Sequence, residues 1–151
     1  MIRRVTFLMC ALTMGVLFAA SSVVPAFGQS AAQTINGLEM SIGSVTRADN
    51  VSLGDCPPGA NIVRGVIRPG DTREYATVTI DVKVTPSFDA SAILTPPTLQ
   101  DDAGTTFRTA QAFTDMGSPE TYSCGFSFRV PKGAALTTLT IGETTFDLAG
   151  K

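Results

Sequence analysis

Histidine and tryptophan are both missing from this chain of 151 residues. Without histidine the protein lacks the usual general base at neutral pH and the commonest metal ligand. Hydrolysis by a Ser-His or Cys-His pair therefore has no candidate residue. Without tryptophan, a surface for stacking sugars would have to be built on tyrosine or phenylalanine. The composition predicts a protein that is not an enzyme and that carries no cofactor.

Cysteine is also scarce, and one of the three cysteines lies in an N-terminal export signal. Arg3 and Arg4 precede an apolar run over residues 5–24, which is followed by Pro25 and small residues ending at Gly28. This order of charge, apolar run and small residues is typical of a secretory signal peptide. We predict that residues 1–28 are removed by cleavage after Gly28, which leaves a secreted or periplasmic protein.

The mature chain is short of both positive charge and long apolar runs. Nine basic and thirteen acidic residues remain after Arg3 and Arg4 are removed, which gives a net charge of about −4. An acidic balance argues against nucleic acid as a partner. No second stretch approaches the roughly 20 apolar residues that a membrane span needs. We therefore expect one domain with no membrane span, and a monomer.

Cys56 and Cys124 are the two cysteines left after cleavage. In an oxidising compartment such a pair predicts a disulfide. Closing a loop of this length contributes about 4 kcal/mol in the chain-entropy model. Two free thiols are the alternative. A redox-active pair is disfavoured because the spacing is not C-x-x-C.

Apolar residues recur with a period of two in most of the mature chain, which predicts strands and no helix. The two strongest strands cover residues 74–85 and 121–130, and a weaker one covers 38–42 with its pattern slipping at Val45. Hairpins are predicted over 99–105 and 136–148. Residues 29–36 are expected to form a flexible leader, and 46–61 a loop, since the latter is rich in Gly, Asp and Pro.

About seven short antiparallel strands predict an all-β fold, an antiparallel immunoglobulin-like β-sandwich over residues 37–149. Tyr122 stands two residues before Cys124, as in the tyrosine corner of immunoglobulin domains. The alternative is that Tyr122 is one more core aromatic. Cys56 follows a different pattern from those domains, because it lies in a loop bounded by prolines.

The chain resembles the small secreted immunoglobulin-like domains of the mycobacterial immunoprotective extracellular antigen type. The resemblance lies in the signal peptide, the long strand over 74–85, the hairpin Leu99–Thr105 and the segment Phe126–Gly133. It implies an exported sandwich that binds proteins or the cell envelope. It supplies no catalytic residues.

Loops at the ends of a sandwich are ordinary recognition surfaces. The candidate loops cover residues 49–61, 86–92 and 111–120, and Phe88 and Phe113 are the candidate binding residues within two of them. The alternative for each phenylalanine is a place inside the end of the sandwich. We expect a binding module whose partner is an unknown protein or envelope component. A structural or accessory envelope protein is the alternative.

Asp101 and Asp102 form the densest carboxylate pair. Adjacent strand residues point to opposite faces, so the pair would have to act from a turn. A calcium site is a further alternative, because calcium prefers clustered oxygens, but the D-x-D-x-D-G spacing is missing. We expect a solvated hairpin tip and no metal site, with Asp101 and Asp102 as the weak candidates.

Overall fold

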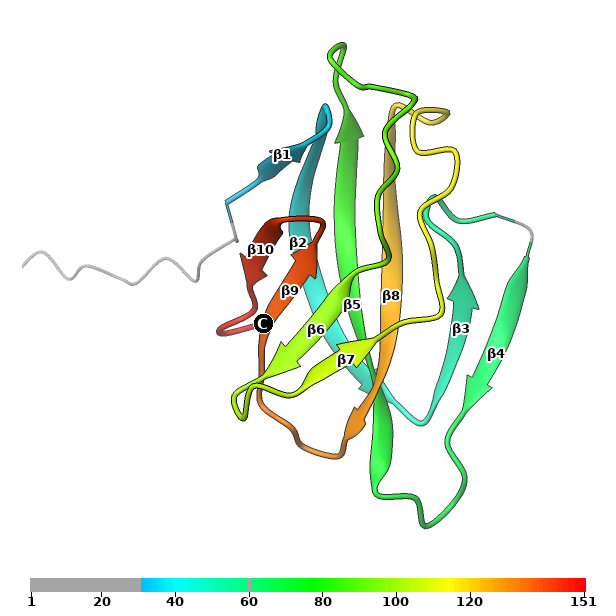
Figure 1. The fold of residues 1–151 in the computed structure, drawn as a ribbon. Coiled ribbons are helices and arrows are strands. Elements are labelled where there is room, and N and C mark those ends of the chain that lie inside the picture. The colour runs from blue at the N-terminus through cyan, green and yellow to red at the C-terminus, as the bar shows by residue number, and fades with distance from the viewer. Residues whose placement is uncertain (1–30, 60) are drawn as a thin grey trace, which may run out of the picture.

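The structure, a computed structural model, describes residues 31–59 and 61–151. Every regular element in this part of the chain is a β-strand (Figure 1). The strands are β1 (Gln33–Ile35), β2 (Leu38–Ala48), β3 (Asn50–Gly54), β4 (Ile62–Val66), β5 (Arg73–Val84), β6 (Thr98–Asp101), β7 (Thr106–Arg108), β8 (Thr121–Pro131), β9 (Leu136–Ile141) and β10 (Thr144–Asp147). The predicted signal peptide lies outside the described residues.

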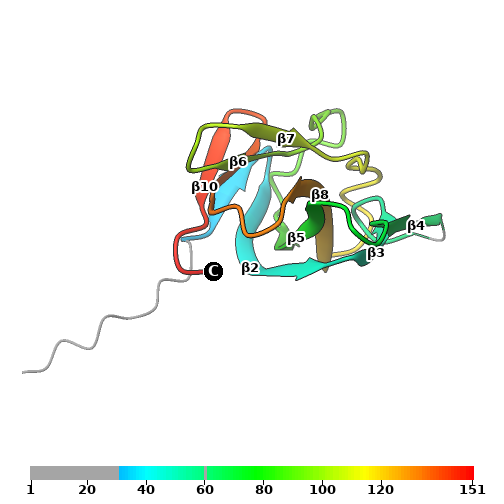
Figure 2. The same cartoon turned by 90° about the horizontal axis from the view of Figure 1, so that it is seen from below.

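The strands form two four-stranded sheets and one separate hairpin. The first sheet has the order β1-β2-β5-β8, the second has the order β10-β9-β6-β7, and β3 pairs with β4. All of these strand pairs are antiparallel. Figure 2 shows the second sheet as a layer over the first, with the β3–β4 hairpin beyond β8. The predicted all-β antiparallel sandwich is confirmed.

The connectivity is immunoglobulin-like once β1 and the β3–β4 hairpin are set aside. Of the seven remaining strands, the first (β2), second (β5) and fifth (β8) lie in one sheet. The third (β6), sixth (β9) and seventh (β10) lie in the other. The fourth, β7, pairs with the third, whereas in constant-type immunoglobulin domains the fourth strand joins the first sheet. The domain is therefore an immunoglobulin-like sandwich with an extra hairpin inserted between its first two strands.

The alternation of apolar and polar residues along β5 and β8 explains which side chains form the core. β5 and β8 pair over eleven residues from Arg73↔Pro131 to Lys83↔Thr121, so their alternating apolar residues face the second sheet together. Burying each large apolar side chain stabilises the fold by roughly 1.5–3 kcal/mol. The largest fully buried side chains come from both sheets: Phe126, Phe128, Phe146, Leu38, Met40, Ile80, Leu99, Leu139, Ile141, Val78, Val130 and Pro97.

Two segments differ from the sequence-based expectation. Residues 33–35 of the expected flexible leader form β1, which pairs with β2, and Gln33 donates a hydrogen bond to the carbonyl of Thr145 in the other sheet. Residues 46–48 continue β2 past a bulge between Ile42 and Ser44. Much of the expected loop over 46–61 is therefore strand, because β3 follows at Asn50.

No helix in the described part of the chain has the length and apolar character needed to cross a bilayer.

Candidate functional site

The β3–β4 hairpin is where the molecule departs most from a minimal sandwich. Val51 and Leu53 of β3 alternate with polar or small residues, and β3 pairs with β4 from Asn50↔Val66 to Gly54↔Ile62. In the described residues this pair forms a sheet of its own. Pro57 and Pro58 follow β3 and prevent the strand from continuing into the core. The hairpin therefore stands beside the sandwich and does not extend either sheet.

Exposed aliphatic side chains gather on β4. The exposed large hydrophobic residues of the described chain are Ile62 (62 %), Val63 (67 %), Val66 (57 %) and Ile93 (91 %). Three of these four lie in one strand of five residues, whereas isolated exposed aliphatics are ordinary on a protein surface.

The backbone of β4 is also open along one edge. Ile67 donates a hydrogen bond of 2.8 Å to the carbonyl of Asp49, which makes these two residues a hydrogen-bonded pair. Pairs in an antiparallel ladder alternate, so Val63 and Gly65 also bond to β3. The N–H and C=O groups of Ile62, Arg64 and Val66 then point to the edge that no other described strand covers. Exposed edges of this kind are places where another strand can pair.

Tyr75 and Gly65 hold the hairpin against the outer face of the first sheet. A Cβ built on Gly65 would lie 2.9 Å from Cζ and from the hydroxyl oxygen of Tyr75. No real Cβ makes so close a contact, so the tyrosine ring fits because this position is glycine. The contact explains why Gly65 is buried while its neighbours in β4 are exposed.

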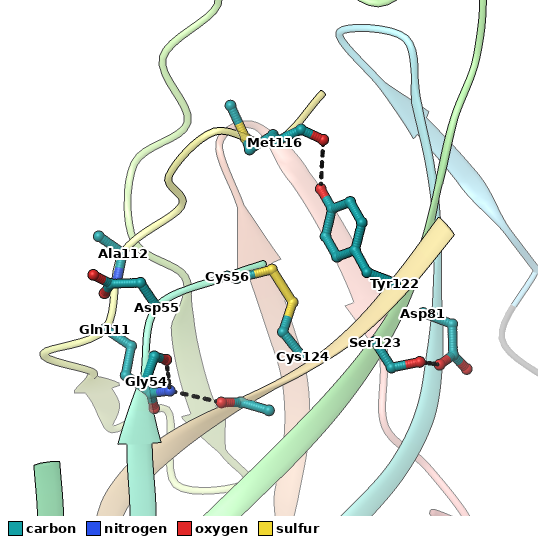
Figure 3. Close-up of a disulfide and its surroundings, with 11 residues drawn as sticks. Gly54, Asp55, Cys56, Asp81, Gln111, Ala112, Met116, Tyr122, Ser123 and Cys124 are labelled. Atoms are coloured by element: carbon teal, nitrogen blue, oxygen red, sulfur yellow. Dashed lines mark hydrogen bonds between the residues drawn. A yellow bond between two sulfur atoms is a disulfide. The ribbon is translucent and has the colours of Figure 1, made fainter. Parts of the chain in front are cut away.

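Gln111 connects the end of the hairpin to the edge of the sandwich (Figure 3). Its Nε2 donates to the carbonyl of Gly54 at 2.6 Å and to the carbonyl of Gly125 at 2.7 Å. Its Oε1 accepts from the N–H of Ser127 at 2.7 Å. Gln111 is buried, and its amide supplies β8 with a donor and an acceptor in the way that a neighbouring strand would. β8 is the end strand of its sheet, so this side chain satisfies groups that the ladder leaves open.

The disulfide lies beside Gln111. Cys56 and Cys124 form the predicted bond, which joins the segment after β3 to β8 (Figure 3). Cys56 also forms a parallel bridge with Phe113: its N–H donates to the carbonyl of Ala112 at 2.9 Å, and its carbonyl accepts from the N–H of Thr114 at 2.7 Å. The Asp55 carboxylate accepts from the N–H of Ala112 at 2.9 Å. Covalent and polar bonds thus fix the hairpin at the end of β3, where Asp55 and Cys56 follow the strand.

A cleft of about 220 Å³ separates the hairpin from the first sheet. It is lined on the hairpin side by Ser52, Gly54 and Ile62, and on the sheet side by Thr77 and Gly125. The lining carries no histidine, and its one carboxylate, Asp55, already accepts a hydrogen bond from the N–H of Ala112. The cleft therefore offers shape and backbone groups and no acid–base pair.

Two cationic side chains lie on β4 or just beyond it. Arg64 and Arg68 are exposed, and neither forms an ion pair among the described residues. Arg129 pairs with Asp71, and Lys132 lies 3.5 Å from Asp49. The hairpin therefore combines apolar side chains with unpaired positive charge.

The carboxylates at the base of β5 are already held by cations. Burial acts to raise the pKa of Asp71, but the N–H of Arg73 and the guanidinium of Arg129 outweigh it and place that pKa below its usual value. Burial likewise acts to raise the pKa of Glu74, and the N–H of Gly133 with the guanidinium of Arg47 lowers it by more. Each of these acids forms an ion pair with an arginine other than Arg64.

The two predicted binding residues meet at the end of the sandwich where Cys56 forms its bridge with Phe113. Phe88 and Phe113 line one hollow of about 490 Å³ together with Ile93 and Met116. Both phenylalanines are half-buried and pack against the core, and the Phe113 ring centroid lies 4.9 Å from that of Phe126. Both rings thus serve the packing of the sandwich end, and Ile93 is the most exposed apolar side chain there. Their role in binding stays a prediction.

Asp101 and Asp102 lie where β6 ends and the turn to β7 begins, but the expected solvated tip holds for Asp102 alone. Asp101 is buried, and its carboxylate accepts from the N–H of Thr105 at 2.7 Å, which closes the turn. Asp102 is exposed. In the described part of the chain no three His, Cys, Asp or Glu residues are grouped so that they could hold a metal ion.

Tyr122 has the hydrogen bond of a tyrosine corner. Its hydroxyl donates to the carbonyl of Met116, six residues upstream, at 3.0 Å (Figure 3). Burial raises the pKa of Tyr122 to about 12, so the hydroxyl stays protonated and keeps donating. The bond fixes the loop before β8, and β8 takes the place of the fifth strand of an immunoglobulin domain, one strand earlier than the usual corner.

Sequence reasoning did not find the free edge of β4 or the role of Gln111. The signal for β4 was present: Ile62, Val63 and Val66 form a short apolar run that ends before Pro69 and Gly70. That run predicts a strand, but its exposure depends on where the strand stands relative to β8. Gln111 gave no signal, since a single glutamine in a polar segment is ordinary.

The fold and these surfaces define an immunoglobulin-like β-sandwich with an inserted hairpin. No family model matches the chain, and no curated protein matches it, so the resemblance to the mycobacterial antigen family stays a hypothesis. Among solved structures, an uncharacterized β-sandwich protein from Clostridium difficile 630 is similar to this chain. The match has a TM-score of 0.48 and 12 % sequence identity, and it covers 79 % of this chain and 89 % of that one.

Proposed function

We propose that this protein is an exported, non-enzymatic module that binds a protein or envelope component through the β3–β4 hairpin. The single observation that supports the proposal most is the exposure of Ile62, Val63 and Val66 on one strand with an open backbone edge. Apolar side chains gathered on an exposed strand are a feature of recognition surfaces. Export is supported by the predicted signal peptide and by the Cys56–Cys124 disulfide.

The absence of a paired acid and base in the cleft favours binding over catalysis. Binding needs a fixed surface, and the hairpin is fixed by Gln111, Tyr75 and the disulfide. A surface that is already in place loses little conformational entropy when a partner arrives.

Site-specific photocrosslinking in the producing cell tests this proposal. A benzophenone side chain placed at Val63 should capture a partner, because that position is two-thirds exposed on β4. The matched control is Ala103, which is exposed at the tip of the β6–β7 hairpin. A third probe at Ile93 tests the hollow lined by Phe88 and Phe113. Adducts at Val63 and none at Ala103 support the proposal, whereas adducts at Ile93 alone would transfer the function to the hollow lined by Phe88 and Phe113.

A further inference from the structure

We propose that the free edge of β4 binds an extended, acidic segment of a partner protein as an additional antiparallel strand. The inference rests on the proposed binding function and names both the mode of recognition and the chemistry of the partner. In this mode, main-chain hydrogen bonds hold the added segment, and side chains at alternate positions select it.

The backbone of β4 has the groups that such a strand needs. The N–H and C=O groups of Ile62, Arg64 and Val66 point away from β3, as the ladder alternation requires. Three residues with both groups free can form six hydrogen bonds to one incoming strand. Extended segments pair with open edges of this type when side chains do not block them.

The side chains of these three residues determine which partner residues would fit opposite them. Ile62 and Val66 are aliphatic, and Arg64 between them is an exposed cation that forms no ion pair in the described part of the chain. Residues directly opposite each other across a ladder interact, and opposite charges there are favourable. A carboxylate opposite Arg64, flanked by aliphatic residues two positions away on each side, complements all three. Arg68, two residues beyond the strand, favours a second carboxylate.

The same charge disfavours a second copy of this chain. If two β4 strands paired antiparallel in full register, Ile62 would lie opposite Val66 and Arg64 would lie opposite the other Arg64. Like charges directly opposite each other are destabilising. Shifting the register avoids this clash but leaves fewer residues paired. The edge therefore selects an acidic partner over itself.

Three contacts keep the edge in place before a partner binds. Gly65 lies against the ring of Tyr75, the carbonyl of Gly54 accepts from Gln111, and Cys56 is bonded to Cys124. They hold β4 by one face, at Gly65, and β3 by its end, so the outer edge of β4 stays uncovered by other described strands. The disulfide fixes this arrangement only in an oxidising compartment.

A designed peptide tests the inference with the purified mature domain, its disulfide intact. The probe is acetyl-Glu-Thr-Val-Thr-Glu-Thr-Val-Thr-amide, which places its second Glu opposite Arg64, its two Val residues opposite Val66 and Ile62, and its first Glu near Arg68. The control peptide has Lys in place of both Glu residues. Amide NMR spectra should show shifts centred on Ile62, Arg64 and Val66 with the acidic peptide. We expect about tenfold weaker binding of the Lys peptide at low salt.

Charge reversal makes the test independent of folding. Arg64→Glu is an exposed change, so the variant should keep the melting temperature of the parent. It should lose affinity for the Glu peptide by about tenfold and gain affinity for the Lys peptide. The change Arg108→Glu, at an exposed position in β7, is the matched control and should leave both affinities unchanged.

Four results would overturn the inference: no shifts at millimolar peptide, equal binding of both peptides, shifts centred on Phe88 and Ile93, or β4 shifts that grow with protein concentration alone. The last would identify a second copy as the occupant. None of these outcomes bears on the crosslinking at Val63, which can still show a partner bound in another way. Failure of the strand-addition mode is therefore distinguishable from failure of the binding function.

Discussion

The sandwich and the β3–β4 hairpin place the same kind of residue in opposite surroundings. Val78 and Ile80 of β5 are fully buried between two sheets, whereas Val63 and Ile62 of β4 are exposed by more than half. The sandwich is stabilised by apolar burial, but a two-stranded hairpin is at best marginally stable by itself in water. The hairpin depends on Gln111, Tyr75 and the disulfide. The comparison shows that the exposed aliphatic side chains of β4 contribute to the surface and not to the core.

Truncating one side chain in each region should give the largest difference in the free energy of unfolding. Phe126→Ala removes a fully buried ring that contacts Phe113, and we expect it to lower the free energy of unfolding by about 3–5 kcal/mol. Val63→Ala should change it by no more than about 0.5 kcal/mol, because the side chain is exposed. Urea unfolding of the two variants checks the difference. Equal losses would mean that the hairpin belongs to the core.

The second largest difference between the hairpin and the sandwich should follow from removal of the disulfide. A Cys56→Ala/Cys124→Ala double variant should lose about 2–4 kcal/mol of stability. The sandwich strands should persist, since their pairing does not involve Cys56. Hydrogen exchange should then accelerate in β3 and β4 far more than in β5 and β8. Uniform acceleration would contradict an independent hairpin, and two alkylatable thiols in the native protein would exclude the bond.

Gln111 should have a smaller effect, confined to the junction. Gln111→Met keeps the length of the side chain but leaves the carbonyl of Gly125 and the N–H of Ser127 without their partner. Leaving buried polar groups unpaired should cost about 1–3 kcal/mol. The matched control is Gln100→Met, whose exposed amide makes one bond of 3.3 Å to the carbonyl of Gly104. Thermal melts of the two variants would coincide if Gln111 were merely a loop residue.

The same contrast explains what the sequence could predict. β5 and β8 alternate over ten or more residues, and burial on one face makes that pattern readable. The sequence predicts a loop over 46–61 because that segment is rich in Gly, Asp and Pro, whereas the structure has the five-residue strand β3 within it. The supports of the hairpin are Tyr75, which contacts Gly65, and Gln111, which bonds Gly54, and both lie outside the hairpin. Local patterns carry no information about such supports.

The candidate site likewise depends on tertiary packing that local sequence patterns do not report. Phe88 and Phe113 are candidates because they lie in predicted end loops, with a place inside the sandwich end as the alternative, and tertiary packing half-buries both. The free edge of β4 depends on which strands end each sheet, and that order is a property of the whole topology. The disulfide could be predicted because residues 29–151 contain two cysteines, Cys56 and Cys124, and therefore one possible pairing.

The smallest expected effect is a loss of stability in acid, which arises from Glu74 and Asp71 at the base of the sandwich. The folded-state pKa of Glu74 is lowered from 4.5, so its contribution to stability is fully present above pH 4.5 and is lost as the pH falls through the lower folded-state value. Asp71, whose pKa is lowered from 3.8, contributes in the same direction.

Unfolding measured between pH 6 and pH 3 in wild type, Glu74→Gln and Arg47→Met checks this. Glu74→Gln removes the titrating group, so it should lose less stability over the interval than the wild type does. Arg47→Met should also flatten the profile, since it removes the guanidinium that bonds Glu74 and the carbonyl of Ala134. Identical profiles in all three proteins would show that this ion pair does not contribute. A flattened profile in Glu74→Gln alone would assign the lowered pKa to the N–H of Gly133, which donates to Glu74 at 3.0 Å, and not to Arg47.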